Sequence, residues 1–298
     1  MPRLLGLALA SKFFRKFKKV KEFGKFSKQG NEVAFGTIGD ASTSEGHFFE
    51  TLNAAGVLQV PMVLSVWDDA YGISVPAKYQ TTKENISEIL KGFQRTETEE
   101  GYEIFKVNGW DYTALIHTYE NAADIARDSH VPVLIHVCEL TQPQGHSTSG
   151  SHERYKSQER LEWEREYDCN LKFREWILKN NIAEEEELQI LEKALKKEVR
   201  LAKKDAWAEF LEPQTTEQKK LVTLMRALAD SSPNKAFIER LTNDIIALEE
   251  PLKRDLHSKA RKALRYVLGE DHPAKAALLN WVKEFGAFCQ PLYSSHLY

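Results

Sequence analysis

Short β-rich runs alternate with longer helical stretches between residues 31 and 140, and this alternation restricts the possible folds more than any other feature of the chain. Such an order predicts βαβ units that build a parallel sheet with flanking helices, an α/β fold. Continuous apolar runs such as VPMVLSV and VPVLIHV are typical of strands that are covered on both faces. The predicted strands are 33–38, 60–67, 104–107 and 131–140. The predicted helices between them are 47–58, 84–93 and 111–128.

The second half of the chain has a different character. After a polar loop rich in Ser, Gly and His, β-branched runs become rare and helical periodicity dominates. We therefore expect a first domain over residues 1–165 and a helical extension over residues 166–298. The charged runs 184–187 and 261–265 are predicted to be solvated helix faces. One apolar series at helical spacing predicts a packing face: Leu188, Leu191, Leu195, Val199 and Ala202.

The N-terminal segment of the sequence can be interpreted in two ways. Residues 1–26 are basic and amphipathic, which suits either an internal helix leading into a strand or a transit or membrane-surface segment. We favour the internal helix, because no cleavage-like signal follows it.

The last residues, WVKEFGAFCQPLYSSHLY, are aromatic and contain a proline. They predict that the sequence is a piece of a longer chain.

Composition limits which classes of binding partner and which cellular compartment we expect. The 298 residues carry a net charge of −3, which gives no general attraction to nucleic acid. No apolar run approaches the roughly 18 residues of a membrane span. The three cysteines are far apart and form no metal-binding pattern. We expect no nucleic-acid or membrane partner and a cytoplasmic setting.

A turn at the end of the first predicted strand has the features of a phosphate site. Gly39, Asp40 and Ala41 occupy this strand end, and the N–H groups of Ala41 and Ser42 can face an anion where a helix begins near residue 44. Ser42 and Glu45 also match a capping box, which needs no ligand. The two interpretations are compatible, so the turn alone does not decide between them.

The next strand end brings two more acids to the same edge of the sheet. Asp68 and Asp69 follow the strand 60–67, and 26 residues (42–67) separate Ala41 from Asp68. Mg²⁺ is commonly held by one or two carboxylates together with phosphate oxygens. Asp40, Asp69 and the carbonyl of Tyr71 therefore form a candidate magnesium site beside a diphosphate. The chain contains neither a Walker phosphate loop nor a complete dinucleotide fingerprint.

These motifs together resemble a known family. GDASTSEGHFFETLNAAGVLQVPMVLSVWDDAYGISVP, with GHSTS further on, is similar to the alpha part of the thiamine diphosphate-dependent decarboxylating component of 2-oxo acid dehydrogenases. The branched-chain, 2-oxoisovalerate (3-methyl-2-oxobutanoate) type looks most alike, in a form whose alpha and beta parts are fused. The likeness covers residues 1–165 and is weaker beyond them.

The resemblance assigns roles to particular residues. It implies that Asp40, Asp69 and Tyr71 hold Mg²⁺ and that His146, in GHSTS, lies near the reactive ring of thiamine diphosphate. Ser147 falls where mitochondrial relatives carry a regulatory phosphorylation site. His47 and His136 have no such support, and we interpret them as a helix-surface and a core residue. The implied cofactor-binding residues are Gly39, Asp40, Ala41, Ser42, Asp69, Tyr71, Ile73 and His146.

The resemblance also implies an activity and partners. A 2-oxo acid would be decarboxylated, and its acyl group would pass to the lipoyl group of an acyltransferase. The beta part would supply the glutamate that activates the cofactor, and a supporting loop would precede residue 1. On this view the chain cannot turn over alone. The alternatives are a pyruvate-type dehydrogenase component and a scaffold that keeps the fold without the cofactor.

Two departures from the family pattern carry physical consequences. Family members commonly have glycine where Ala41 stands, and an alanine with positive φ would cost roughly 1 kcal/mol. Asparagine is common where Asp69 stands, so the aspartate adds a negative charge beside a diphosphate. We expect a nearby cation to offset that charge.

Overall fold

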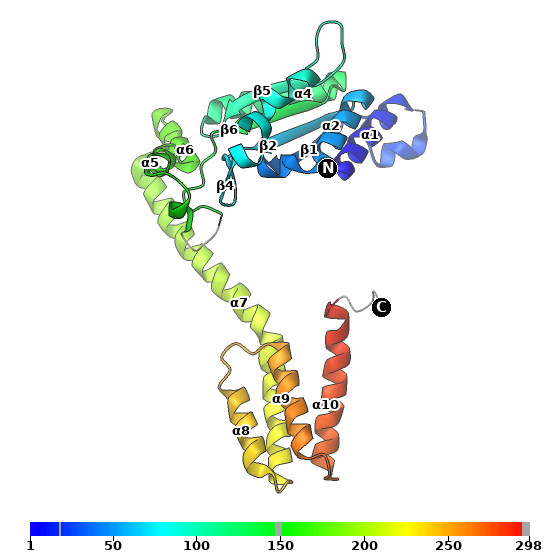
Figure 1. Cartoon of the computed structure of the whole chain (residues 1–298), viewed down its shortest axis with the longest axis vertical. Coiled ribbons are helices and arrows are strands. Elements are labelled where there is room, and N and C mark those ends of the chain that lie inside the picture. Colours follow the sequence, from blue (N-terminus) through cyan, green and yellow to red (C-terminus); the bar gives the residue numbers. More distant parts are fainter. Residues whose placement is uncertain (18, 147–150, 294–298) are drawn as a thin grey trace. The chain divides into compact units, whose positions relative to one another are not determined.

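The computed structural model describes residues 1–17, 19–146 and 151–293, which belong to two compact units. The first unit is Met1–Glu185 and the second is Glu186–Tyr298 (Figure 1). The predicted domain boundary after residue 165 stays a prediction.

A four-stranded parallel sheet forms the centre of the first unit, and it confirms the predicted α/β fold. The strand order is β1-β2-β6-β5, and every neighbouring pair is parallel. The observed strands start and end within three residues of the predicted ones. They are β1 (Ala34–Gly39), β2 (Met62–Trp67), β5 (Glu103–Asn108) and β6 (Val133–Cys138).

Helices cover both faces of this sheet, as the apolar strands predicted (Figure 1). On one face, α1 (Pro2–Lys16) and α2 (Gly46–Leu58) pack over a core that includes Phe48 and Leu64. On the other face, α4 (Tyr112–Ser129) packs over Val63 and Ile135. Successive residues of β2 point to opposite faces, so Val63 and Leu64 enter different cores. The N-terminal segment is thus an internal helix of the fold.

The remaining elements of the first unit are short and lie largely around the strand ends. The predicted helix 84–93 starts only at Ile86, because Lys83 and Glu84 have positive φ, and it consists of one α-helical turn (86–89) followed directly by a 3-10 turn (90–93). These elements are η1 (Lys21–Lys25), η2 (Ala41–Ser44), β3 (Tyr71–Gly72), β4 (Val75–Pro76), η3 (Ala77–Tyr79), η4 (Thr82–Glu84), α3 (Ile86–Ile89), η5 (Leu90–Phe93), η6 (Ser151–Arg154), α5 (Gln158–Glu166) and α6 (Cys169–Lys179).

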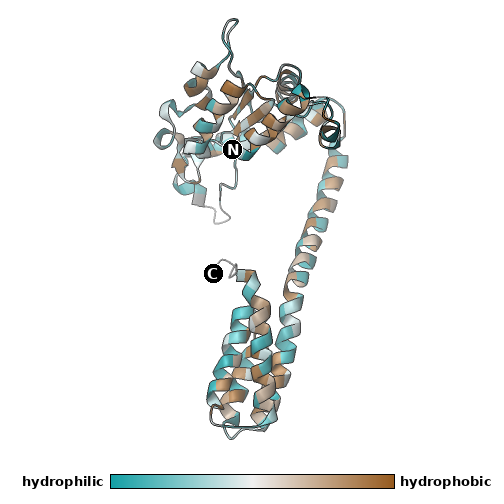
Figure 2. Cartoon of the chain, turned by 90° about the vertical axis from the view of Figure 1, so that its right-hand side faces the viewer, coloured by the Kyte–Doolittle hydropathy of each residue, from teal (hydrophilic) through white to brown (hydrophobic). Residues whose placement is uncertain are grey.

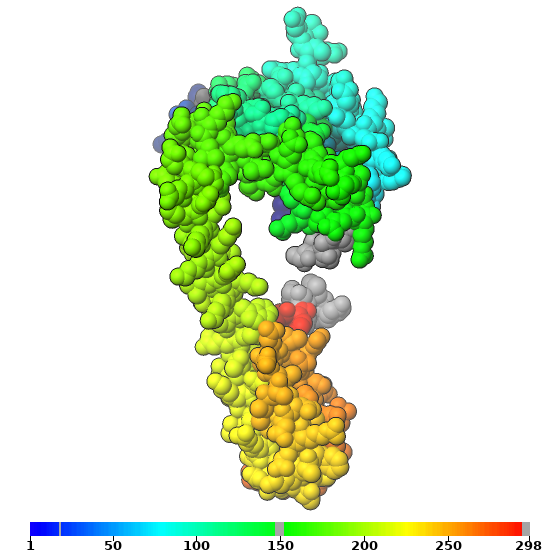
Figure 3. Space-filling view, turned by 90° about the vertical axis from the view of Figure 1, so that its left-hand side faces the viewer, coloured from blue at the N-terminus to red at the C-terminus, as the bar shows by residue number. Residues whose placement is uncertain are grey.

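The second unit is helical, as predicted, and has its own core. Leu221, Met225, Ile238, Leu256 and Leu278 are fully buried in it. Hydrophobic and hydrophilic residues alternate around its helices (Figure 2), and the space-filling view shows the yellow and orange helices closely packed (Figure 3). Its elements are α7 (Glu185–Asp230), α8 (Lys235–Ile246), α9 (Lys253–Tyr266), α10 (Pro273–Cys289) and η7 (Gln290–Tyr293).

One expectation about α7 is wrong. The series beginning at Leu188 does lie on a helix, but residues 189–210 are all exposed. The buried apolar residues of α7 lie nearer its end, where Leu221, Met225 and Leu228 enter the core with α8, α9 and α10. Helical spacing identified the helix correctly, but it did not show which turns are covered.

Within the described residues no helix is both long enough and apolar enough to cross a bilayer. The three cysteines are all free.

Candidate functional site

The carboxyl ends of β1 and β2 bring the two predicted acidic turns together. Gly39 pairs with Trp67 in the parallel register, and the N–H of Asp40 donates to the carbonyl of Trp67 at 3.0 Å. Asp40 and Asp69 therefore follow adjacent strands at one edge of the sheet. This is the edge at which open α/β sheets bind ligands.

A cavity of about 550 Å³ lies at this edge. Its walls come from the turns after β1 and β2 and from the segment after β6. The eight residues predicted to bind the cofactor all line it: Gly39, Asp40, Ala41, Ser42, Asp69, Tyr71, Ile73 and His146. The structure brings these residues together, and their roles stay predictions.

Asp40 is almost entirely buried, with 8% of its surface exposed. Burial, and next the negative charges of Asp68 and Asp69, raise its pKa to about 7. The N–H of Ala41 opposes this shift by donating a hydrogen bond. Simultaneous ionisation of these neighbouring carboxylates is therefore unfavourable near neutral pH, and a bound cation would reduce the repulsion between them.

One carboxylate oxygen of Asp69 is buried and has no hydrogen-bond partner among the described residues. Its Oδ1 accepts a hydrogen bond from the N–H of Tyr71 at 3.3 Å, but its buried Oδ2 accepts none from the described residues. The Nε2 atom of His146 stands 3.8 Å from Oδ2. Burial raises the pKa of Asp69, while the positive charges of His146 and Lys156 act against that shift. Buried acceptors are normally satisfied, so Oδ2 is placed to bind a ligand.

Asp68 has a structural role that the sequence interpretation missed. Its Oδ1 accepts the N–H of Ala70 at 2.8 Å, and its Oδ2 lies 2.8 Å from Nε2 of His136. His136 is fully buried, and its Nδ1 is 3.0 Å from Oγ of Ser87. The interpretation of His136 as a core residue is confirmed. No local sequence signal indicates its partner, which lies 68 residues away.

The predicted capping box does not form. Ser42 lies in the 3-10 turn η2, and α2 begins only at Gly46, with Glu45 at its N-cap position and no side-chain hydrogen bond to the cap. The hydroxyl of Thr43 instead donates to the carbonyl of Asp40. This tight extra turn displaces the helix start from the expected position near residue 44. A capping box therefore does not explain why Ser42 and Glu45 occupy these positions.

The backbone question raised by Ala41 has a clear answer. Ala41 is not among the residues with positive φ, whereas Ala70, in the second acidic turn, has φ of +68°. The strain expected of an alanine with positive φ is therefore absent at Ala41 and present at Ala70. At Ala41 only the methyl group has to be accommodated.

We predict that Ala70→Gly raises the free energy of unfolding by about 1 kcal/mol, because glycine adopts positive φ without a clash at its Cβ. Urea unfolding of the ligand-free chain measures the change. Ala41→Gly is the matched control, since its φ is not positive and glycine should bring no gain there. Equal stabilisation by both substitutions would contradict the assignment of strain to Ala70.

The raised pKa of Asp40 predicts a pH dependence of stability. Its value of about 7 in the folded chain exceeds the ordinary 3.8, so between these values the folded state binds more protons than the unfolded state. The free energy of unfolding should therefore fall as pH rises from about 4 to about 7. Asp40→Asn should weaken this fall in denaturant unfolding of the ligand-free chain. An unchanged pH profile in the variant would refute the prediction.

The remaining predicted residues fall in different places. The side chain of His47 is 78% exposed on α2, which confirms it as a surface residue. Ser147 lies outside the described residues.

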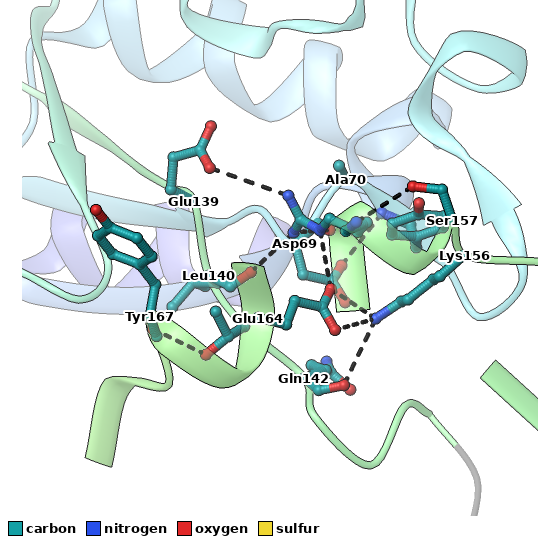
Figure 4. Close-up of polar contacts among 12 residues, drawn as sticks. Asp69, Ala70, Glu139, Leu140, Gln142, Lys156, Ser157, Glu164 and Tyr167 are labelled. Carbon is teal, nitrogen blue, oxygen red and sulfur yellow. Dashed lines mark hydrogen bonds and ion pairs between the residues drawn. The ribbon is translucent and has the colours of Figure 1, made fainter. Parts of the chain in front are cut away.

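Sequence reasoning also missed Lys156, Arg160 and Glu164, which recur every four residues on α5 and just before it. Lys156 and Glu164 are labelled in Figure 4, and Arg160 donates to the carbonyl of Asp69. The spacing of Arg160 and Glu164 was a usable signal, because residues four apart lie on one helix face; Lys156 precedes α5, so helical spacing did not indicate its position.

The protein side chains alone do not enclose a metal ion. Among residues 1–17, 19–146 and 151–293, no group of three or more His, Cys, Asp or Glu side chains is arranged to hold one. Two carboxylates at one cavity do suit Mg²⁺, which typically takes its remaining ligands from phosphate oxygens, backbone carbonyls and water. The arrangement fits an ion bound together with a phosphorylated ligand.

The fold and the cavity define an α/β protein with a cavity at the carboxyl ends of its parallel strands. The chain belongs to the Dehydrogenase E1 component family, whose model matches residues 1–214. This is a family of thiamine diphosphate-dependent 2-oxo acid dehydrogenase components, so the general form of the resemblance is confirmed. Residues 215–298 lie beyond the match.

Curated relatives agree with the family. The chain is 26% identical over 172 residues to "Pyruvate dehydrogenase E1 component subunit alpha" of Rickettsia bellii (strain RML369-C), covering 58% of this chain and 50% of the relative. It is 28% identical over 207 residues to the protein of the same name from Staphylococcus aureus (strain Mu50 / ATCC 700699), covering 68% and 51%. The chain thus spans about half the length of these relatives. The predicted branched-chain type and the fused chain stay predictions.

Proposed function

We propose that this chain binds thiamine diphosphate and Mg²⁺ at the cavity and serves as the alpha component of a 2-oxo acid dehydrogenase. One observation carries the proposal: Asp40 and Asp69 line the same cavity, and the buried Oδ2 of Asp69 lacks a hydrogen-bond partner among the described residues. A buried acceptor without a donor costs about 1–3 kcal/mol. A bound cation would remove that cost.

The residues present fit this pair of ligands. Asp40, Asp69 and the carbonyl of Tyr71 would hold Mg²⁺, and diphosphate oxygens would take further positions around it. Gly39, Ala41 and Ser42 line the same cavity, where the backbone N–H groups of Ala41 and Ser42 would serve a phosphate; in the ligand-free chain the N–H of Ala41 donates to the carboxylate of Asp40.

Catalysis divides between the cofactor and the chain. When bound, thiamine diphosphate supplies the carbanion chemistry that decarboxylates a 2-oxo acid. The chain orients the cofactor through the metal ligands. His146, whose side chain is 25% exposed at the cavity, can donate a hydrogen bond or a proton to a negatively charged oxygen.

Substrate and partners extend the proposal beyond this chain. The sequence likeness favours a branched-chain 2-oxo acid, whereas the relatives are named for pyruvate dehydrogenase, so pyruvate is the second candidate. We propose that turnover needs a beta component, that a lipoyl-bearing acyltransferase accepts the acyl group, and that the protein works in the cytoplasm.

Two of these points, the substrate and the need for a beta component, can be tested by activity. Comparing both substrates with and without an added beta component tests these points, and decarboxylation by the chain alone would refute the need for a partner.

Thermal unfolding with and without ligands tests cofactor binding directly. A ligand that binds only the folded state stabilises it by RT ln(1 + [L]/Kd), about 2.7 kcal/mol at a hundredfold excess over Kd. Thiamine diphosphate with Mg²⁺ should therefore raise the Tm clearly, while thiamine without its phosphates should raise it far less. No rise with the complete pair would favour the scaffold alternative and overturn the proposal.

A further inference from the structure

A cluster of charged residues joins two of the segments that line the cavity. It consists of Lys156, just before α5, and of Arg160 and Glu164 on α5; Lys156 and Glu164 are buried, and Arg160 is 21% exposed. Lys156 and Glu164 are labelled in Figure 4. The segment after β6, shown in green, lies beside the cyan segment around the β3–β4 hairpin (Figure 3). There the rings of Tyr71 and Tyr155 are 5.6 Å apart.

Lys156 and Glu164 form the centre of this cluster. Their side chains are 0% and 1% exposed, and Nζ of Lys156 is 2.8 Å and 2.9 Å from the two carboxylate oxygens of Glu164. Nζ also lies 3.5 Å from the carbonyl of Gln142 and 5.1 Å from the ring centre of Tyr71. Taking such a pair out of water costs free energy that its attraction often fails to recover. Stability alone is therefore a weak explanation for the pair.

Arg160 connects the pair to the turns at the cavity. Its Nε donates to Oε1 of Glu164 at 2.9 Å, which fixes the plane of the guanidinium group. Its Nη2 then donates to the carbonyl of Asp69 at 3.3 Å and to the carbonyl of Leu140 at 3.4 Å. These carbonyls belong to the turn after β2 and to the segment after β6. One side chain thus holds the backbone that presents Asp69 and the segment that leads to His146.

We propose that Arg160, oriented by the Lys156–Glu164 pair, is a positioning residue that fixes Asp69 relative to the His146 segment for binding of a divalent cation and diphosphate. The inference rests on the proposed function. The planar guanidinium donates from Nε to Glu164 and from Nη2 to both carbonyls, and the single ammonium of lysine cannot reach all three acceptors from two separate atoms in this geometry. Lys156 also provides a positive charge that acts on Asp69, as expected for an aspartate at that position.

The principal test is calorimetric titration of Mg²⁺ and thiamine diphosphate into the parent chain and into Arg160→Met. We expect the Kd to rise about tenfold or more, as for other residues that orient metal ligands. Arg160→Lys should recover little of the loss. Arg165→Met is the matched control, because Arg165 is exposed on the same helix and should leave the Kd unchanged. An unchanged Kd in Arg160→Met would overturn the proposal.

Amide hydrogen exchange adds a readout that needs no ligand. In the ligand-free Arg160→Met chain, exchange should become faster at residues 69–71 and 141–146 and stay unchanged in α4. Uniformly faster exchange would mean a general loss of stability and would contradict a positioning role. The double variant Lys156→Met/Glu164→Gln leaves no lone buried charge, and it should reproduce the local effect by freeing Arg160.

The proposed function and the positioning role of Arg160 can be refuted separately. If the parent chain binds the ligands and Arg160→Met binds them equally well, the positioning role is wrong and the proposed function stands. If the parent chain binds neither ligand, the proposed function fails, and hydrogen exchange still decides whether Arg160 holds the two segments together.

Discussion

Asp40→Ala is expected to abolish detectable binding of thiamine diphosphate and Mg²⁺, with a rise in Kd of about a hundredfold or more. Asp40 is a buried carboxylate at the cavity, and alanine leaves no oxygen for the cation. Alanine also removes a carboxyl group whose pKa is raised first by burial and next by repulsion from Asp68 and Asp69. The ligand-free variant should therefore fold at least as well as the parent. Loss of binding would then report on the site and not on the fold.

Asp69→Asn provides the contrasting result in the same titration. An amide oxygen still serves Mg²⁺, and loss of one negative charge beside Asp40 lowers the cost of a bound diphosphate. We expect a Kd equal to the parent value or lower. Glu50→Ala, an exposed change on α2 with 81% of the side chain accessible, is the control for handling and concentration. Parent-like binding by Asp40→Ala would rule out this site for the cation.

The elements that position the site were predictable because they are simple consequences of burial. A strand covered on both faces, such as β2, must be apolar throughout, so its extent is visible in the sequence. The parallel order then brings the residues after β1 and β2 together without further information. This explains why Asp40 and Asp69 were found to line one cavity.

What the sequence did not reveal depends on single backbone angles and on partners far along the chain. Nothing local shows that Ala70, and not Ala41, has positive φ. Nor does anything local show that Asp68 meets His136 across the sheet. The charged runs 184–187 and 261–265 were predicted to be solvated, and Arg261 and Arg265 are indeed exposed, but no pattern indicated that Lys156 and Glu164 are buried. Burial of a charge is a property of the packed structure.

The methyl group of Ala41 and the missing side chain of Gly72 fit each other across the cavity wall. A Cβ placed on Gly72 would lie 2.8 Å from Cβ of Ala41 and would also meet the side-chain amide of Gln80. That amide donates to the carbonyl of Val75 at 2.6 Å, so it can move only by losing a hydrogen bond. The alanine that departs from the family pattern thus occupies space that Gly72 leaves open. Ala41 is accommodated by its neighbour and not by a strained backbone.

Gly72→Ala is therefore expected to lower the free energy of unfolding by about 2 kcal/mol, as overpacking commonly does. Gly72 lines the cavity, so the substitution should also weaken binding of Mg²⁺ and thiamine diphosphate. Adding Ala41→Gly should restore part of both losses, with an interaction free energy of at least about 0.5 kcal/mol in a double-mutant cycle. Gly92→Ala, where a Cβ meets no atom within 4 Å, is the control. Strictly additive effects of the two substitutions would show that Ala41 and Gly72 do not share this space.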